Sequence, residues 1–260
     1  VSGERQGYYA DFCSLATLAQ TYTHGFFHAG TYSSFRGRTH GRPLDRTLIP
    51  ASALLAYTCN HDQIGNRALG DRPSAYLTDG QLAVKAALVL CSPYTPMLFM
   101  GEEWGARTPF QFFTSHTDPA LGAATAAGRK AEFAEHGWST GEVPDPQDPR
   151  TFLDSKLDWK TADSTLLTCY RALIALRRTR SELTDPWLEQ VRVDYDETAR
   201  WLIVHRGRLR LLCNLSAEPV GIPVTGTEVL SWEPPSRHPE HTVVPPHSFT
   251  ILETDQTARS

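Results

Sequence analysis

The sequence predicts an α/β fold over residues 1–186, followed by a small antiparallel β domain over residues 187–260. Residues 51–59 are almost all small or apolar, which is typical of a strand buried on both faces of a parallel sheet. A helix over residues 79–90 and a second short apolar stretch at residues 97–100 follow, so strands and helices alternate. This alternation predicts a parallel sheet with helices outside it.

The other elements are read from hydrophobic period and turn residues. Apolar residues at helical spacing predict helices over residues 9–20 and 163–180. The aromatic stretch 22–41 is predicted to be a long ordered loop, and residues 110–159 are predicted to be mostly loop. Beyond Pro186, four short β-prone runs are separated by Gly, Pro and Asn, namely residues 201–205, 209–215, 220–224 and 248–252.

Composition excludes several classes of function. The chain is 40% hydrophobic and 21% charged, its formal net charge is -4, and no apolar run is long enough to cross a bilayer. We therefore expect no membrane partner. We also expect no nucleic-acid partner, because no Lys/Arg-rich stripe is present. Arg177, Arg178 and Arg180 form a small basic cluster, which is predicted to be a solvated helix end.

The cysteines indicate a reducing compartment. Their number, five, is odd, they are widely scattered, and no CxxC pair occurs, so neither a disulfide framework nor a zinc site is expected. We expect a cytoplasmic protein with no metal and no cofactor. The chain begins at Val1 and its only methionines are Met97 and Met100, so it is expected to be a fragment of a longer chain.

A polar run follows the first predicted strand and carries the strongest functional signal. It reads Asn60-His61-Asp62-Gln63-Ile64-Gly65-Asn66-Arg67 and places an imidazole, a carboxylate, amides and a guanidinium together. In barrel enzymes the C-terminal ends of strands carry the catalytic groups. Asp62 could instead cap the following turn, but the adjoining polar residues favour an active site. Glu102 and Glu103, after the second predicted strand, are open to either a capping or a site role.

This run resembles the last signature motif of the α-amylase clan of glycoside hydrolases. Within that clan, five more segments make the chain similar to the maltooligosyltrehalose trehalohydrolases, namely residues 3–9, 99–104, 111–113, 133–138 and 155–159. The resemblance implies the C-terminal part of a catalytic (β/α)8 TIM barrel over residues 1–186, followed by a β-sandwich domain over residues 187–260. It also implies a retaining hydrolase that cleaves the α-1,4-glucosidic bond next to the trehalose end of maltooligosyl trehalose and releases trehalose.

The resemblance also implies residue roles. Asp62 matches the carboxylate that stabilises the oxocarbenium-like transition state, and His61 is expected to hydrogen-bond the sugar at the cleavage point. The stretch through Asn66 is expected to line the substrate site, so the expected substrate-binding residues are His61, Asp62, Gln63, Ile64, Gly65 and Asn66. Retaining glycosidases also need a nucleophile and an acid/base. In the family both precede residues 3–9, so this chain by itself is expected to be inactive.

Alternative interpretations remain open. Another enzyme of the clan, such as a branching enzyme or an amylase, would share the His-Asp pair but is not expected to carry segments 133–138 and 155–159. A non-catalytic carbohydrate-binding fragment is a third possibility. Several aromatic side chains could stack on sugar rings, although packing in the core is the commoner fate of such groups: Phe26, Phe27, Tyr32, Trp104, Phe112, Phe113 and Trp138.

Overall fold

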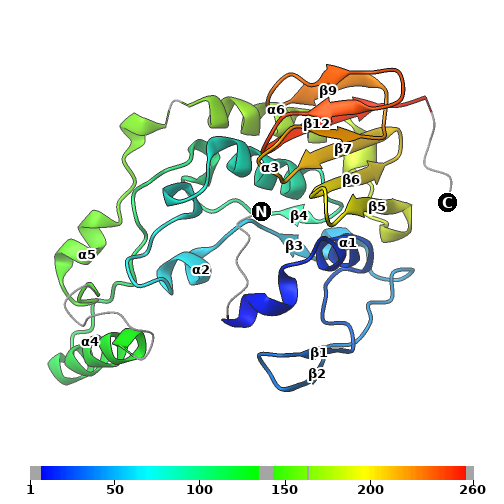
Figure 1. Ribbon diagram of the computed structural model, residues 1–260. Helices are drawn as coiled ribbons and strands as arrows, with labels where there is room; N and C mark the ends of the chain where they lie inside the picture. The colour runs from blue at the N-terminus through cyan, green and yellow to red at the C-terminus, as the bar shows by residue number, and fades with distance from the viewer. Residues whose placement is uncertain (1–6, 135–142, 163, 256–260) are drawn as a thin grey trace. The chain divides into compact units, whose positions relative to one another are not determined.

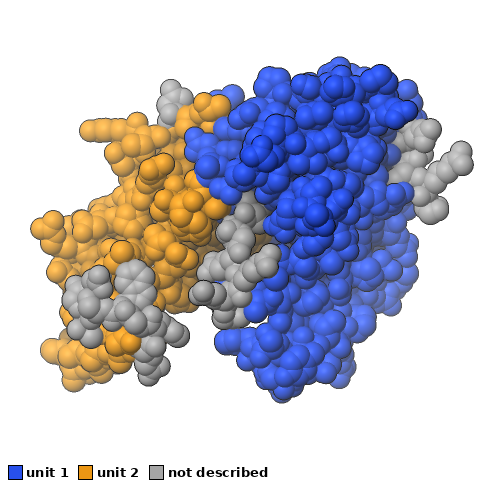
Figure 2. Space-filling view, viewed as in Figure 1, with its two compact units in different colours: residues 1–56, 78–97, 168–260 blue, residues 57–77, 98–167 orange. Residues whose placement is uncertain are grey.

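The computed structural model describes residues 7–134, 143–162 and 164–255 (Figure 1). The chain divides into two compact units, which are interleaved along the sequence (Figure 2). The first unit comprises residues 1–56, 78–97 and 168–260, and the second comprises residues 57–77 and 98–167.

A short parallel strand pair lies in the first unit. β3 (Leu55–Ala56) pairs with β4 (Thr95–Pro96) in the register Leu55 to Thr95 and Ala56 to Pro96. The predicted strand over residues 51–59 was too long, because Pro50 begins the 3-10 turn η2 (Ala51–Ala53) directly before it. The predicted strand over residues 97–100 was wrong, since the ladder ends where the Met97 amide donates to the Ala56 carbonyl.

Helix α3 (Asp79–Leu90) connects the two parallel strands and agrees with the predicted helix. It begins with a capping box: the Thr78 hydroxyl accepts from the Gln81 amide at 3.3 Å, and the Gln81 side chain accepts from the Thr78 amide at 2.9 Å. Eight of its residues are buried, which suits a helix packed on more than one side.

Residues 7–24 form two helical pieces, whereas one helix over residues 9–20 was predicted. A 3-10 helix, η1 (Gly7–Phe12), is followed by α1 (Leu15–His24), and Ser14 separates them because its hydroxyl accepts from the Thr17 amide at 3.1 Å. The predicted long loop over residues 22–41 contains an antiparallel hairpin of β1 (Thr31–Ser33) and β2 (Arg38–His40).

The last third of the chain forms two antiparallel sheets within the described residues. One has the strand order β5-β6-β7-β12-β9, and the other has the order β10-β11-β8. Ile203, Leu212, Ile222, Val244 and Leu252 form one buried cluster that draws on both sheets. The strand bounds are β5 (Val191–Asp196), β6 (Trp201–Arg206), β7 (Leu209–Asn214), β8 (Val220–Ile222), β9 (Thr227–Ser231), β10 (Ser236–Arg237), β11 (Thr242–Val244) and β12 (Ser248–Glu253).

Two arginines of the basic cluster are not solvated as predicted. Arg177 lies in the last turn of α6 (Thr165–Thr179), and Arg180 directly follows that helix. The next elements are α7 (Ser181–Thr184) and the 3-10 helix η6 (Leu188–Gln190). Arg177 donates to the carbonyl oxygens of Leu90, Ser92 and Tyr94 at 2.6–2.8 Å, so it satisfies the end of α3, and burial lowers its pKa. Arg178 is exposed.

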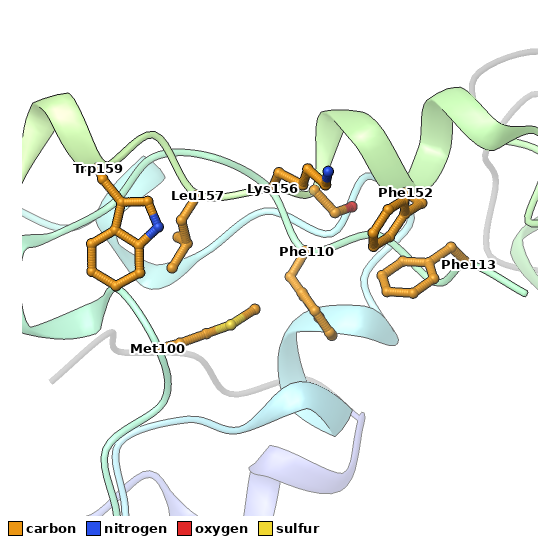
Figure 3. A pocket seen from close by; sticks show the side chains of 8 residues that line it. Met100, Phe110, Phe113, Phe152, Lys156, Leu157 and Trp159 are labelled. Atoms are coloured by element: carbon orange, nitrogen blue, oxygen red, sulfur yellow. The ribbon is translucent and has the colours of Figure 1, made fainter.

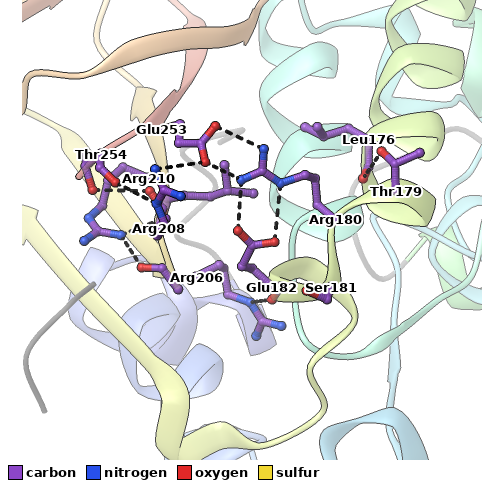
Figure 4. A network of polar contacts seen from close by, with 12 residues as sticks. Leu176, Thr179, Arg180, Ser181, Glu182, Arg206, Arg208, Arg210, Glu253 and Thr254 are labelled. Atoms are coloured by element: carbon purple, nitrogen blue, oxygen red, sulfur yellow. Dashed lines mark hydrogen bonds and ion pairs between the residues drawn. The ribbon is translucent and has the colours of Figure 1, made fainter. Parts of the chain in front are cut away.

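Arg180 forms an ion-pair network with two carboxylates (Figure 4). Its Nη2 atom lies 2.9 Å from Glu182 Oε1 and 2.9 Å from Glu253 Oε1. Arg208 also approaches Glu253, with Nη2 at 3.5 Å from Oε1. The network therefore joins the segment after α6 to the last strand, β12.

The second unit is mostly helical turns and connecting segments. The predicted loop over residues 110–159 contains α4 (Pro119–Ala134) and α5 (Pro149–Asp154). Alanine-rich residues and an Asp148 cap followed by a proline at the first helical position favour these helices over a loop. The remaining elements are α2 (His61–Gly65) and the 3-10 helices η3 (Pro73–Ala75), η4 (Glu102–Trp104) and η5 (Trp159–Thr161).

The five cysteines all lie in the described part of the chain, and all are free thiols. Across the same part, every helix is too short or too polar to span a bilayer.

Candidate functional site

The polar run of the sequence forms helix α2 in the second unit. Asn60 caps it: the Asn60 side chain accepts from the amides of Asp62 at 2.8 Å and Gln63 at 3.3 Å. The Gln63 side chain in turn accepts from the Asn60 amide at 2.8 Å, which completes a capping box. Asn60 and Gln63 therefore perform the capping role, and the Asp62 carboxylate is left available for other contacts.

His61 and Asp62 present their side chains to solvent from the first turn of α2. Their side chains are 69% and 67% exposed, and His61 Nε2 lies 3.4 Å from Asp62 Oδ1. A carboxylate beside an imidazole can oppose a developing positive charge while the imidazole exchanges hydrogen bonds with a hydroxyl group. The pair therefore offers a hydrogen-bonding ring and a negative charge at one exposed point of the second unit.

The other predicted site residues divide between surface and core. Asn66 is exposed and Gln63 is half-buried in its capping contact, whereas Ile64 and Gly65 are buried. Ile64 is only 1% exposed, so its side chain anchors α2 in the second unit. This burial indicates a structural role for the Ile64 side chain, and a substrate-binding role for it stays a prediction.

Glu102 ties the segment before α2 to the segment after β4. Its Oε2 atom accepts from the Thr58 hydroxyl at 3.2 Å, from the Cys59 thiol at 3.5 Å and from the Phe99 amide at 3.1 Å. These three contacts all lie N-terminal to η4, the helix that Glu102 itself begins. Its geometry indicates a positioning role, because Thr58 and Cys59 directly precede Asn60, the cap of α2.

Two glycines make this bend possible. Gly101 and Gly105 flank η4 with φ values of +87° and +69°, a left-handed region that other residues rarely adopt. A Cβ atom on Gly101 would also lie 2.8 Å from a Leu157 methyl and 2.9 Å from Ala106 Cβ. The chain therefore turns tightly at the point where Glu102 must reach back to Phe99.

Arg72 also holds the segment that carries Phe99 and Met100. Arg72 is 2% exposed, and its guanidinium donates to the carbonyl oxygens of Thr108 at 2.6 Å and Met100 at 2.7 Å. It also lies over the Phe99 ring, 5.1 Å from the centroid. Burial lowers the Arg72 pKa, and the neighbouring Cys59, Glu102 and Glu103 oppose that shift.

Arg129 of α4 holds the C-terminal end of α2. Its Nη2 atom donates to the carbonyl oxygen of Gly65 and, at 3.3 Å, to that of Arg67. The guanidinium also contacts the rings of Phe112 and Phe133, with centroids at 5.0 and 4.5 Å. Sequence reasoning missed Arg129, because it lies in an alanine-rich helix 64 residues from Gly65 and no local pattern marks it.

The aromatic residues proposed for sugar stacking differ in exposure and in what they contact. Trp104 is 6% exposed and packs against Trp159, so packing is confirmed for Trp104. Phe113 lines a pocket, together with Phe110, Phe152 and Trp159. In the first unit Tyr32 is 64% exposed, whereas Phe26 and Phe27 are half-buried. Trp138 and the rest of segment 135–138 lie outside the described residues.

Comparisons with known proteins agree with the resemblance seen in the motifs. The chain is 61% identical over 262 residues to a malto-oligosyltrehalose trehalohydrolase of Mycobacterium tuberculosis, a match that covers 99% of this chain and 45% of that protein. It is 36% identical to the protein of that name from Saccharolobus solfataricus, over 89% of this chain and 38% of that protein. The chain thus spans less than half the length of these relatives, and its resemblance to malto-oligosyltrehalose trehalohydrolases is confirmed over nearly its whole length.

A domain family and solved structures add to this finding. A family described as a domain of unknown function, DUF3459, matches residues 186–251. A crystal structure from Salmonella typhimurium that carries the name α-amylase is 34% identical, with a TM-score of 0.83 over 96% of this chain and 44% of that chain. A trehalulose synthase at 16% identity has a TM-score of 0.50 over 77% of this chain and 43% of its own, and shows likeness of fold alone. The mixture of helices and antiparallel sheets is therefore that of α-amylase family structures.

Proposed function

From its likeness to the malto-oligosyltrehalose trehalohydrolases, we propose that this chain is part of a retaining glycoside hydrolase that acts on maltooligosyl trehalose. The reaction is hydrolysis of the α-1,4-glucosidic bond next to the trehalose end, which releases trehalose. The observation that carries the proposal is the exposed pair of His61 and Asp62 on α2. This helix begins with a capping box, and Arg129 hydrogen-bonds to its last carbonyl oxygen.

In this proposal Asp62 stabilises the transition state. Retaining glycosidases pass through an oxocarbenium-like state, and a carboxylate close to the ring opposes the positive charge that develops there. His61 donates a hydrogen bond to a hydroxyl group of the same sugar, and Gln63 and Asn66 extend the wall of the site. Ile64 and Gly65, which are buried, support that wall from beneath. The motifs of this chain assign neither the nucleophile nor the acid/base, so the proposal gives both roles to carboxyl groups elsewhere in the complete polypeptide.

The same proposal includes a finer architecture. Residues 1–186 would form the C-terminal part of a (β/α)8 barrel, and residues 187–260 would form its β-sandwich domain. The parallel pairing of β3 and β4 around α3 supports the barrel assignment, because parallel strands joined by a helix are its repeating unit. The five free cysteines support a reducing, cytoplasmic compartment.

The test is substitution of Asp62 in the complete polypeptide that carries these 260 residues. With maltooligosyl trehalose as substrate, Asp62→Asn is expected to lower kcat by at least about 100-fold, because an electrostatic stabiliser of the transition state is removed. Asp79→Asn is the matched control, since Asp79 is exposed in the first turn of α3 and is not part of the site.

Product analysis distinguishes the alternatives. Release of trehalose from maltooligosyl trehalose, with little action on plain maltooligosaccharide, supports the proposal. Cleavage of both substrates at internal bonds would instead favour an amylase. Transfer of glucan segments to new branches would favour a branching enzyme. An unchanged kcat in Asp62→Asn would show that this carboxylate has no part in the reaction.

A further inference from the structure

The second unit contains a pocket of about 460 Å³ that the proposed catalytic roles do not use (Figure 3). Phe110, Phe113 and Phe152 lie on one side of it, and Met100, Leu157 and Trp159 lie on the other. The volume falls within the range of roughly 300–1,000 Å³ that is common for small-molecule sites. The pocket is therefore large enough to admit a sugar ring between two apolar walls.

The phenylalanine wall is held in place by contacts between its own rings. Phe110 packs edge-to-face on Phe113 at 5.7 Å between centroids, and Phe113 packs in the same way on Phe152 at 5.2 Å. The Ser155 hydroxyl accepts from the Gln111 amide at 3.0 Å and donates to the Thr151 carbonyl oxygen at 2.7 Å. These bonds join the segment that carries Phe110 and Phe113 to the helix that carries Phe152.

The pocket adjoins the candidate site at two points. The Phe110 amide donates to the Gly70 carbonyl oxygen at 2.8 Å, and the Phe110 ring lies 4.0 Å from where a Cβ atom on Gly65 would stand. Gly65 is the last residue of α2. At the other side, Met100 precedes Gly101 and Glu102, whose carboxylate bonds to Thr58 and Cys59.

The lining chemistry suits a pyranose ring. Trp159, Phe152 and Met100 are 69%, 46% and 45% exposed, so apolar side chains of the pocket lining are accessible from solvent. A pyranose presents C–H groups on its faces, which pack against aromatic rings, and hydroxyl groups at its rim. Lys156 also lines the pocket, with Nζ 5.1 Å from the Phe152 centroid, and its ammonium group can donate to such a hydroxyl.

We propose that this pocket binds a glucosyl ring of the α-glucan substrate, next to the ring that His61 and Asp62 contact. The proposal rests on the proposed function, because it assigns a second sugar site on the same substrate. We expect the pocket to stabilise the bound substrate and the transition state by the same free energy. Loss of the pocket therefore raises KM and leaves kcat nearly unchanged.

The test uses Trp159→Ala and Phe113→Ala in the complete polypeptide, with Trp187→Ala as the matched control. Trp187 is 41% exposed and belongs to the first unit. We expect each pocket variant to raise KM for maltooligosyl trehalose by about 10-fold, with kcat changed by less than about twofold. Trp159→Phe keeps an aromatic face and is expected to recover most of the affinity. An unchanged KM in both alanine variants would overturn the proposal.

Direct binding separates this inference from the proposed function. Titration of the same variants with maltotetraose, followed by calorimetry, measures the pocket without any need for catalysis. If wild-type protein releases no trehalose but binds maltotetraose more tightly than Trp159→Ala does, the proposed function fails and the pocket stands. If wild type is active and the titration curves of wild type and both alanine variants coincide, the function stands and the pocket proposal fails. A melting temperature within a few degrees of wild type shows that a variant is folded.

Discussion

The Glu102 carboxylate accepts a hydrogen bond from the Thr58 hydroxyl at 3.2 Å, across 44 residues of sequence. Because Thr58 lies two residues before the cap of α2, this bond holds the segment that leads into the helix of His61 and Asp62. Glu102 therefore acts on the candidate site through the backbone that it holds.

Glu102→Ala is expected to lower stability by about 1–3 kcal/mol, because the Thr58 hydroxyl and the Phe99 amide lose their acceptor. We expect kcat for trehalose release to fall together with stability, since the start of α2 is no longer held. Glu102→Gln keeps an acceptor oxygen and is expected to recover part of both. Urea unfolding and steady-state kinetics measure the two effects.

The exposed Glu240 provides the control for this substitution, and Glu240→Ala is expected to change neither quantity. A positioning role predicts that the conservative glutamine variant restores kcat. If Glu102→Gln unfolds like wild type yet remains as inactive as Glu102→Ala, the carboxylate charge itself is required and the positioning role is wrong.

Arg129→Met is expected to destabilise the second unit by about 2–3 kcal/mol. The Gly65 and Arg67 carbonyl oxygens would lose a charged donor, and the methionine would retain only the apolar contact with Phe112 and Phe133. Since these carbonyls end α2, kcat is expected to fall as well. Thermal unfolding followed by circular dichroism measures the loss of stability.

Arg107→Met is the corresponding control, because Arg107 is exposed in the same unit. Arg129→Lys tests the shape of the group, since a lysine keeps the charge but lacks the planar guanidinium that lies over the Phe112 and Phe133 rings. Equal melting temperatures for Arg129→Met and Arg107→Met would contradict the role assigned to Arg129.

The Arg180 network predicts a dependence of stability on pH. Hydrogen bonds from Arg180 lower the pKa of both Glu182 and Glu253 below their ordinary value of 4.5 (Figure 4). A lowered carboxylate pKa in the folded state stabilises the protein above the unfolded value of 4.5, and that stabilisation is lost as pH falls through the lower folded values. The free energy of unfolding should therefore decrease as pH falls below about 4.5.

The double variant Glu182→Gln and Glu253→Gln should show a weaker decrease over the same pH range. Urea unfolding at pH 7, 5, 4 and 3 provides the comparison, and Glu189→Gln, at an exposed position, is the control. If the free energy of unfolding falls equally with pH in wild type and in the double variant, the Arg180 network is not the source of that pH dependence.

Local pattern predicted the parts of the fold that depend on neighbours in sequence. The helix over residues 79–90 followed from its apolar spacing, and its observed bounds are the same. Runs 201–205 and 209–215 became β6 and β7, because short runs of β-prone residues separated by glycine favour strands. The helices α4 and α5 were missed, since glycine, proline and polar residues outweighed alanine content and cap signals there.

The motif in residues 60–67 could be identified as a candidate site from sequence because its residues are contiguous and chemically distinctive. Which of its side chains face solvent could not be read from that motif. His61 and Asp62 point outward and Ile64 inward only because the capping box of Asn60 and Gln63 starts a helix, which sets each residue's direction.

The sequence alone therefore determined the functional groups of residues 60–67, the local helix signals and the resemblance to the trehalohydrolases. Each of these depends only on neighbouring residues or on the identity of a motif. The partners of that chemistry were decided by tertiary structure. Glu102 reaches Thr58 across 44 residues, Arg129 reaches Gly65 across 64, and the pocket gathers side chains from residues 100 to 159. Contacts between segments so far apart leave no periodic trace in a sequence, since they depend on how the chain folds back on itself.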